Sequence, residues 1–311
     1  HYYETTCPKC NTVGTISKVI FDKPERSGSN ITIKAINYSC SCTKKGIKSP
    51  DKLDYAKLNT TRKLKNITNT SLLYNSKIAV TENDDIKNIF TGRNLSVLDE
   101  ILSIINKYEP IYQNILKYIL MSILHLCKIT DKHSNSQWPL WIPKTDCVEK
   151  NIIDIYRKKI KKFYDVIPFM KENYFDSQIV ESYNMLSPGK CLLIQKGSQL
   201  ITEQDIPNNG VDLIITDPPY LEQVLYSEYM QLYKPFLNLD YNLNDEIIVS
   251  SAPSRKKNKE DYFHLLDLVF NMCSQKLKLN HYLCLYFHDC NLSVWNELIS
   301  ILEKNCFRFI T

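Results

Sequence analysis

A turn at residues 217–220 combines groups that could act on a nucleobase. It follows the apolar segment VDLIIT and reads Asp217-Pro218-Pro219-Tyr220, whereas a turn that only reversed the chain would more often use Gly, Asn or Ser. The exocyclic amino group of a base is a poor nucleophile, because its lone pair is delocalised into the ring. The Asp217 carboxylate and the Pro218 carbonyl could accept its hydrogens, held in place by the prolines. Tyr220 would offer a flat face to an unstacked base, although a plain turn closing a strand is the alternative.

Four of the eleven cysteines lie near the N-terminus as two close pairs. Cys7 and Cys10 form a C-x2-C pair, and Cys40 and Cys42 form a C-x-C pair after 29 intervening residues. Two short pairs can supply the four thiolates of a tetrahedral zinc site, while four buried cysteines of no special role are the alternative. The spacing favours structural Zn²⁺ with no open position for catalysis. The metal would supply much of the folding energy of so small a segment, so chelation is expected to unfold residues 1–50.

Positive charge is concentrated in the first part of the chain. Residues 1–70 contain 13 Lys and Arg against 5 Asp and Glu, whereas the remaining residues contain 26 against 29. A basic N-terminal module suits a polyanionic partner such as nucleic acid, although an ordinary solvated surface has the same composition. Further along, Arg255, Lys256 and Lys257 could contact phosphates or could form a solvated loop.

The composition narrows the class of protein. The 311 residues are 43% hydrophobic and 23% charged, as in a globular protein of two or three modules. No apolar run approaches the roughly 18 residues that span a bilayer, and no signal peptide is present, so we expect a cytoplasmic protein without a membrane partner. An odd number of cysteines in such a chain indicates reduced thiols. The seven glycines are too far apart for a G-x-G-x-x-G or P-loop motif.

The elements that would position these residues change in type along the chain. Before residue 186, the patterns predict strands at 15–21 and 31–39 and helices at 95–105, 110–127 and 148–164. After residue 186, apolar segments alternate with amphipathic ones. They predict strands at 190–195, 211–216, 281–287 and from 306 onward, a helix or broken helix at 221–237, and helices at 259–277 and 291–305. This alternation predicts an α/β fold whose parallel sheet is covered on both faces, with the 217–220 turn at a carboxyl strand end, where ligands bind.

The turn and its strand resemble motif IV of the S-adenosylmethionine-dependent amino methyltransferases. Asp217, Pro218, Pro219 and Tyr220 match the D-P-P-Y of that family in full. The resemblance implies a Rossmann-like methyltransferase core and these four residues as the catalytic motif. It also implies methyl transfer from S-adenosylmethionine to a flipped base of double-stranded DNA, with adenine N6 favoured over cytosine N4.

Other segments resemble a subgroup of large bacterial and archaeal DNA methylases with an internal zinc ribbon. The segment NIFTGRNLSVLDEI, at residues 88–101, is similar to an F-T-x-R-Q-L element of that subgroup, and residues 220–237 and 277–289 resemble later segments. The similarity touches most of the chain, but only D-P-P-Y is specific. It implies a zinc-ribbon-like module at 1–50, a mainly helical insertion for target recognition at 51–185, and the core at 186–311. It further implies a restriction-modification context with a possible partner subunit.

Two departures from the family concern the cofactor. The F-x-G-x-G loop is missing, which is expected if the chain lacks its natural N-terminus. The expected cofactor contacts are Gly197 and Ser198, but the acid that follows this glycine in the family is absent. A pseudoenzyme or non-catalytic nucleic-acid-binding subunit therefore stays as the alternative. Methylation of RNA or protein is a third reading, although the zinc ribbon favours nucleic acid.

Overall fold

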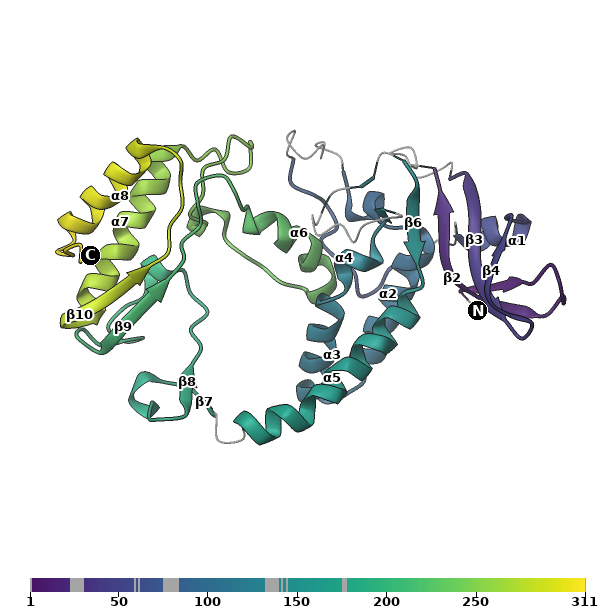
Figure 1. Ribbon diagram of the computed structural model, residues 1–311, viewed down its shortest axis with the longest axis horizontal. Helices are drawn as coiled ribbons and strands as arrows, with labels where there is room; N and C mark the ends of the chain where they lie inside the picture. Colours follow the sequence, from purple (N-terminus) through teal and green to yellow (C-terminus); the bar gives the residue numbers. More distant parts are fainter. Residues whose placement is uncertain are drawn as a thin grey trace. The chain divides into compact units, whose positions relative to one another are not determined.

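The computed structural model describes residues 2–22, 31–58, 60, 62–74, 84–131, 140, 142–143, 145–174 and 178–310. The chain forms two compact units (Figure 1). The first comprises His1–Pro168 and Ser227–Tyr241, and the second comprises Phe169–Tyr226 and Asn242–Thr311. Both units combine helices and strands, so the predicted fold class is confirmed as mixed α/β. The domain boundaries expected at residues 50 and 185 stay predictions.

An antiparallel sheet forms the frame of the first unit. Its strands run in the order β4-β3-β2-β6-β5, and β1 also pairs with β2. The strands are β1 (Glu4–Thr6), β2 (Val13–Phe21), β3 (Ile33–Cys40), β4 (Thr43–Lys48), β5 (Thr130–Asp131) and β6 (Cys147–Lys150). β2 and β3 confirm the strands predicted at 15–21 and 31–39. The helix predicted at 148–164 is wrong at its start, because residues 148–150 pair with β2 as part of β6.

Helices pack with this sheet around one apolar core. They are α1 (Lys52–Leu58), α2 (Gly92–Ile105), α3 (Pro110–Met121), α4 (Leu124–Cys127), α5 (Ile152–Tyr174) and α6 (Tyr226–Leu237), with a 3₁₀ turn η2 at Ile86–Ile89. α2 buries Leu98 and Leu102 with Ile16 and Val19 of β2, as its helical spacing predicts. In α6, Leu232 and Phe236 are buried in the same core. No helix among the described residues has both the length and the apolar character needed to cross a membrane.

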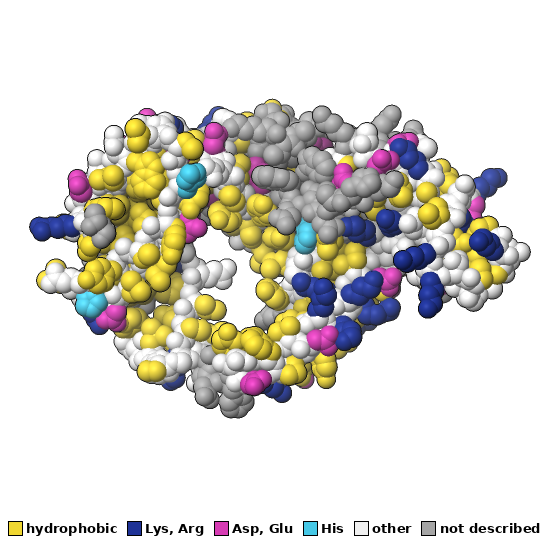
Figure 2. Space-filling model, in the orientation of Figure 1, with side chains coloured by type: hydrophobic (Ala, Val, Ile, Leu, Met, Phe, Trp, Pro, Cys, Tyr) yellow, Lys and Arg dark blue, Asp and Glu magenta, His cyan; other side chains and the backbone are white. Residues whose placement is uncertain are grey.

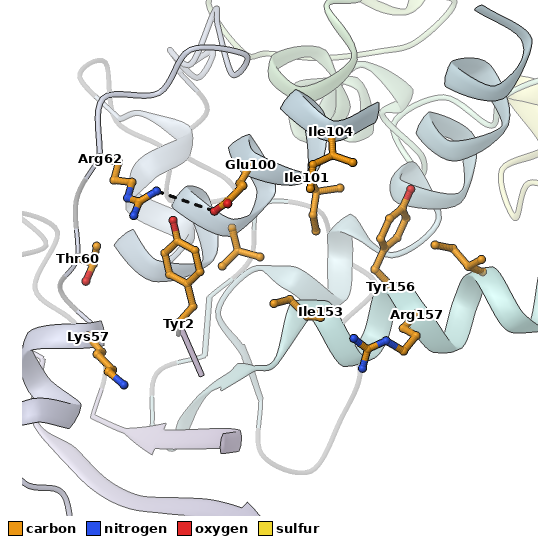
Figure 3. Close-up of a pocket in the computed structure, with 12 residues that line it drawn as sticks. Tyr2, Lys57, Thr60, Arg62, Glu100, Ile101, Ile104, Ile153, Tyr156 and Arg157 are labelled. Carbon is orange, nitrogen blue, oxygen red and sulfur yellow. Dashed lines mark ion pairs between the residues drawn. The ribbon is translucent and has the colours of Figure 1, made fainter. Parts of the chain in front are cut away.

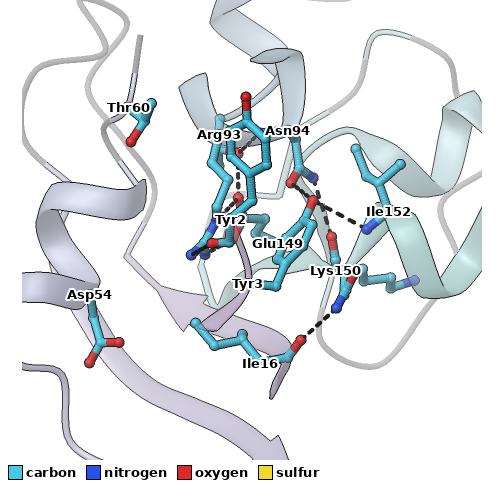
Figure 4. Close-up of polar contacts among 12 residues, drawn as sticks. Tyr2, Tyr3, Ile16, Asp54, Thr60, Arg93, Asn94, Glu149, Lys150 and Ile152 are labelled. Carbon is cyan, nitrogen blue, oxygen red and sulfur yellow. Dashed lines mark hydrogen bonds and ion pairs between the residues drawn. The ribbon is translucent and has the colours of Figure 1, made fainter. Parts of the chain in front are cut away.

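A buried polar network joins α2 to β6 and to the start of the chain (Figure 4). The Arg93 guanidinium is fully buried and donates to both carboxylate oxygens of Glu149, and Thr91 donates to the same carboxylate at 2.5 Å. The Tyr3 hydroxyl donates to Asn94 Oδ1 at 2.7 Å. The buried side chains of Arg93, Glu149 and Asn94 therefore have polar partners, which removes most of the penalty for placing them in the core. Thr91, Arg93 and Asn94 belong to the segment that resembles F-T-x-R-Q-L, so in this structure that segment holds the core together.

The second unit is built on a two-stranded parallel sheet. β9 (Val211–Thr216) pairs with β10 (Leu277–Leu285). Helices α7 (Lys259–Lys276) and α8 (Leu292–Lys304) form a core with this sheet that includes Tyr262, Phe270 and Leu298. A second parallel pair joins β7 (Gln178–Val180) to β8 (Lys190–Leu192), and the 3₁₀ turns are η3 (Tyr183–Met185), η4 (Ser198–Leu200) and η5 (Leu243–Asp245).

Two expectations for this unit differ from the structure. Leu213, Ile215 and Tyr282 lie on the sheet face opposite the helices and are exposed, so the sheet is covered on one face rather than on both. No strand begins at residue 306, because residues 306–310 form a turn and irregular chain. Of the other predicted elements of this unit, β9 has the predicted ends, α7 differs by one residue at one end and α8 by one residue at each end, β8 is shorter than predicted, and β10 begins and ends earlier than predicted.

Candidate functional site

The four N-terminal cysteines come together at one end of the first sheet. Cys7 and Cys10 lie in the turn between β1 and β2, where the Cys7 amide donates to Thr12 and the Asn11 amide donates to Cys7. Cys40 ends β3, and Cys42 follows in the tight turn to β4. The antiparallel pairing of β2 with β3 therefore places two turns, each with two thiols, side by side.

The sulfur atoms have the spacing of a tetrahedral metal site. All four Sγ atoms lie within 4.8 Å of one another. The Cys7–Cys42, Cys10–Cys40 and Cys40–Cys42 Sγ separations are 3.7, 3.9 and 3.4 Å. Four thiolates at about 2.3 Å from a central Zn²⁺ are about 3.8 Å apart, so the thiols fit the ion without rearrangement. A cluster that could hold a metal ion such as zinc is therefore confirmed, and four sulfur ligands make its expected role structural.

Neighbouring polar groups already stabilise the thiolate form of two ligands. The Tyr38 hydroxyl lies 3.2 Å from Cys7 Sγ, and Thr12 Oγ1 lies 3.0 Å from Cys10 Sγ. The Tyr38 hydrogen bond, aided by backbone amides of residues 9 and 10, lowers the pKa of Cys7 to about 5 despite burial. Thr12 likewise lowers the pKa of Cys10. Hydrogen bonds from Cys42 to the other thiols raise the pKa of Cys42 to about 12, so a metal must displace the proton of this thiol to bind it.

Two glycines make room for the tyrosine that supports this cluster. A Cβ at Gly46 would lie 2.5 Å from Tyr38 Cζ, and a Cβ at Gly14 would lie 3.0 Å from Tyr38 Cδ2. Both distances are far inside van der Waals contact, so only glycine lets the Tyr38 ring lie flat across β2 and β4. The sequence analysis identified the four ligands but missed Tyr38, Thr12 and these glycines, because cross-strand neighbours leave no local pattern.

The 217–220 turn begins where β9 ends. Parallel pairing continues to its edge, since the Tyr286 amide donates to the Thr216 carbonyl at 3.0 Å. Asp217 is exposed, and the Tyr220 hydroxyl donates a hydrogen bond to its Oδ1. This bond raises the pKa of Tyr220 and orients the carboxylate. The structure thus places an acid and an aromatic ring together at the carboxyl end of a parallel strand.

Three aromatic residues that the sequence analysis missed hold this turn. The buried Tyr262 hydroxyl of α7 donates to the Pro219 carbonyl at 2.7 Å, and burial raises the pKa of Tyr262 to about 12. The rings of Tyr220 and Phe287 meet edge to face at 5.4 Å, and Phe287 meets Trp295 in the same way at 5.3 Å. Edge-to-face pairs of this kind fix ring orientation. The turn is therefore braced by α7, by the end of β10 and by α8.

The other predicted site residues lie apart from the 217–220 turn in sequence and differ in exposure. Gly197 caps η4, and Ser198 is exposed; no hydrogen bond or ion pair of the described residues joins either one to the 217–220 turn. Arg255 is buried, whereas Lys256 is exposed. The Lys257 ammonium donates to the carbonyls of Leu243, Asn244 and Glu246. These bonds link the loop at 243–246 to the loop that contains Lys257. Of these cations, Lys256 is thus the one exposed to a phosphate.

Comparisons with protein families, with curated proteins and with solved structures found no match for this chain. The chemistry of the two groups of residues must therefore be inferred from their geometry. The first offers four sulfur ligands to one metal ion. The second offers a carboxylate on a proline-fixed turn beside an aromatic ring.

Proposed function

We propose that this chain carries the base-binding half of an S-adenosylmethionine-dependent DNA amino methyltransferase with a structural zinc site. The observation that carries the proposal is the Asp217–Tyr220 turn at the carboxyl end of parallel strand β9. In a Rossmann-like core, that position faces the ligand crevice. The favoured reaction is methylation of adenine N6, with cytosine N4 as the second substrate. The basic composition of the N-terminal part supports a nucleic-acid partner.

The turn has the groups that the chemistry requires. Tyr220 donates to Asp217 Oδ1, and the second oxygen of this exposed carboxylate can accept a hydrogen from the amino group of a flipped base. The Pro218 carbonyl would accept the other hydrogen, and the Tyr220 ring would stack on the base. The Tyr262 bond to Pro219 keeps these acceptors from moving when the base arrives. Preorganised acceptors of this kind lower the barrier without a covalent enzyme intermediate.

The cofactor requires residues beyond those described at the turn. S-Adenosylmethionine would supply the activated methyl group when bound. Gly197 and Ser198 are the candidate contacts in this chain, but they form one short 3₁₀ cap and carry no acid for a ribose. They do not make a complete site, so we place the glycine-rich cofactor loop on another polypeptide segment. The exposed apolar face at Leu213, Ile215 and Tyr282 is consistent with such a segment, since parallel sheets are normally covered on both faces.

The test is methyl transfer from labelled S-adenosylmethionine to double-stranded DNA, followed by digestion to nucleosides. The chain is assayed alone and in any complex that purifies with it. Asp217→Ala should abolish label in N6-methyladenine or N4-methylcytosine, because alanine has no side-chain oxygen to accept the hydrogen of the amino group. Asp212→Ala, at an exposed acid on the same strand, is the matched control and should keep activity. Full activity of Asp217→Ala would refute the assignment.

A non-catalytic nucleic-acid-binding subunit is the second candidate. The serine in place of an acid after Gly197 favours it, as does the absence of an F-x-G-x-G sequence. This candidate predicts that DNA binding is retained while no preparation of the chain or its complex transfers label. Label in RNA rather than DNA would instead support the third reading, an RNA methyltransferase.

A further inference from the structure

A cavity of about 680 Å³ lies in the first unit, between α2 and α5 (Figure 3). Its residues come from five segments: the chain start at Tyr2, the end of α1, the segment with Thr60 and Arg62, and the helices α2 and α5. Small-molecule sites have volumes of about 300–1,000 Å³, so the cavity is large enough for a ligand of that kind. No residue of the Cys cluster or of the 217–220 turn lines it.

The floor of the cavity is aliphatic. Ile101 and Ile104 of α2 face Ile153 of α5 (Figure 3), and Tyr156 and Ile160 of α5 also line the cavity. Ile104 is 49% exposed and Ile153 is 37% exposed, although both helices bury neighbouring apolar residues in the core. Apolar surface that stays accessible inside a concave site favours a ligand with an apolar body, because its burial releases water from both surfaces.

The rim of the cavity is cationic. Three of the lining residues are basic, Lys57, Arg62 and Arg157, against the single acid Glu100. Arg62 lies over the Tyr2 ring at 5.2 Å and is 3.9 Å from Glu100. Its side chain is 64% exposed, so this long ion pair contributes little and can be exchanged for another anion. Figure 3 shows Tyr2, Thr60, Arg62 and Lys57 at one end and the isoleucines at the other.

We propose that this cavity binds a small amphipathic anion, with its apolar body on the α2–α5 floor and its acidic group beside Arg62. Three basic side chains and one acid line the cavity, and the ion pairs of Lys57 with Glu4 and of Arg157 with Asp154, at 4.0 and 3.8 Å, leave the exposed Arg62 as the cation that an anion can reach. Burial and the nearby Glu100 raise the pKa of Tyr2, so its hydroxyl stays protonated, but that hydroxyl is buried and the Arg62 guanidinium is the group offered to the acidic group of the ligand. Glu100 competes with the ligand for Arg62. The site is independent of the proposed methyl transfer.

Two fluorescent probes with the same aromatic body test the proposal. Anilinonaphthalene sulfonate carries one sulfonate, and phenylnaphthylamine lacks it. The full chain should bind the sulfonate probe with one-to-one stoichiometry and more tightly than the neutral probe. Arg62→Gln should lower the affinity for the sulfonate probe about two- to fivefold, and Glu100→Gln should raise it by a similar factor. An exposed ion pair changes an affinity by roughly this amount. Neither substitution should change binding of the neutral probe.

A second test uses a substitution that fills the cavity with a larger side chain. Ile101→Trp should remove binding of both probes, whereas Ile111→Ser, at an exposed isoleucine of α3, should leave both unchanged. Ile215→Ser controls for probe on the exposed sheet face of the second unit. Circular dichroism checks that each variant is folded, and the exposed Arg62 and Glu100 variants decide the matter if Ile101→Trp does not fold. Equal affinity for both probes, or parallel effects of Arg62→Gln and Glu100→Gln, would overturn the proposal.

Discussion

At the residue scale, the Cys7 thiol shows how a neighbour prepares a metal ligand. Its pKa is about 5 because the Tyr38 hydroxyl and two backbone amides donate to the sulfur. A thiol must lose its proton to bind zinc, so a low pKa reduces the competition from protons at neutral pH. Partners of this kind commonly change metal affinity by about 10- to 100-fold. Tyr38 is therefore part of the metal site although it is no ligand.

The first prediction follows from this bond. Tyr38→Phe keeps the ring between Gly14 and Gly46 but removes the hydroxyl, so the pKa of Cys7 should rise towards its usual value. Zinc release on acidification should then begin at a higher pH in the variant than in the wild-type protein. A chromogenic chelator measures release as pH is lowered from 8 to about 4. Tyr112→Phe, at an exposed tyrosine, is the control. Coincident release curves for Tyr38→Phe and wild type would contradict the role given to Tyr38.

The same thiols give the metal-free protein a pH dependence of known sign. The folded-state pKa of Cys7 lies below the unfolded value, so its contribution to stability is present above the unfolded pKa and is lost as pH falls through about 5. The contribution of Cys42 has the opposite sign, because its folded-state pKa is raised to about 12. This contribution to stability is present below the unfolded-state pKa and is lost as pH rises through about 12. Between these limits, acidification from pH 9 to 5 should weaken the metal-free form, and thermal unfolding at several pH values in chelator checks this. A stability that is unchanged over this range would argue against the Cys7 thiolate.

The second residue-scale prediction concerns Tyr262. Tyr262→Phe fills the same space in the core but leaves the Pro219 carbonyl without its donor. The free energy of unfolding should fall by about 1–2 kcal/mol, and in an active complex kcat should fall more than KM changes. Urea denaturation and steady-state kinetics measure the two effects. Tyr112→Phe, at an exposed tyrosine of α3, should change neither quantity.

At the element scale, the first sheet is held by more than the metal. Ile16 and Val19 of β2 and Ile36 of β3 are buried. β2 pairs with β6 as well as with β3. Full unfolding of residues 1–50 on chelation, expected from their composition, would have to break these contacts too. The two cysteine turns have few such contacts, so the metal matters most there.

Chelation should therefore act locally. In chelator, amide exchange and proteolysis should increase at residues 8–12 and 41–46, while β2, β3 and β6 keep slow exchange because their core remains. Hydrogen exchange followed by mass spectrometry, with and without zinc, makes the comparison. The slow-exchanging amides of α7 in the second unit provide the internal control. Equal loss of protection across β2 and β3 would show instead that the metal holds the whole sheet.

The sequence analysis predicted elements with a local pattern and missed what depends on distant partners. The apolar spacing of Leu98 and Leu102 gave α2 correctly, and the two cysteine pairs gave the metal cluster. The strand β6 escaped notice because Glu149, a charged residue in its centre, is satisfied by Arg93 and Thr91, more than 50 positions earlier in the chain. Tyr262 was likewise invisible as a support, since its partner Pro219 is 43 residues away. Local periodicity contains no information about such pairs.

At the scale of the whole molecule, charge distinguishes the surfaces that could meet DNA. Between residues 150 and 162 the chain has six Lys and Arg and one Asp, and most of them lie on α5. Lys158 and Lys162 are exposed, and Figure 2 shows basic side chains gathered over this part of the first unit. In β2 and β6, Lys18 is the register partner of Lys150, which extends the basic surface onto the sheet.

If the chain binds DNA as proposed, α5 should contribute phosphate contacts. Each such contact releases counterions, so replacing Lys158 and Lys162 by Gln should reduce the slope of log affinity against log salt by about 2. Fluorescence anisotropy with one duplex at several salt concentrations gives the slope. Lys190→Gln with Lys259→Gln removes the same charge from exposed sites of the second unit and should leave the slope nearly unchanged. An equal fall in both double variants would mean that net charge alone attracts DNA. A larger fall in the α5 variant would assign the phosphate contacts to this helix.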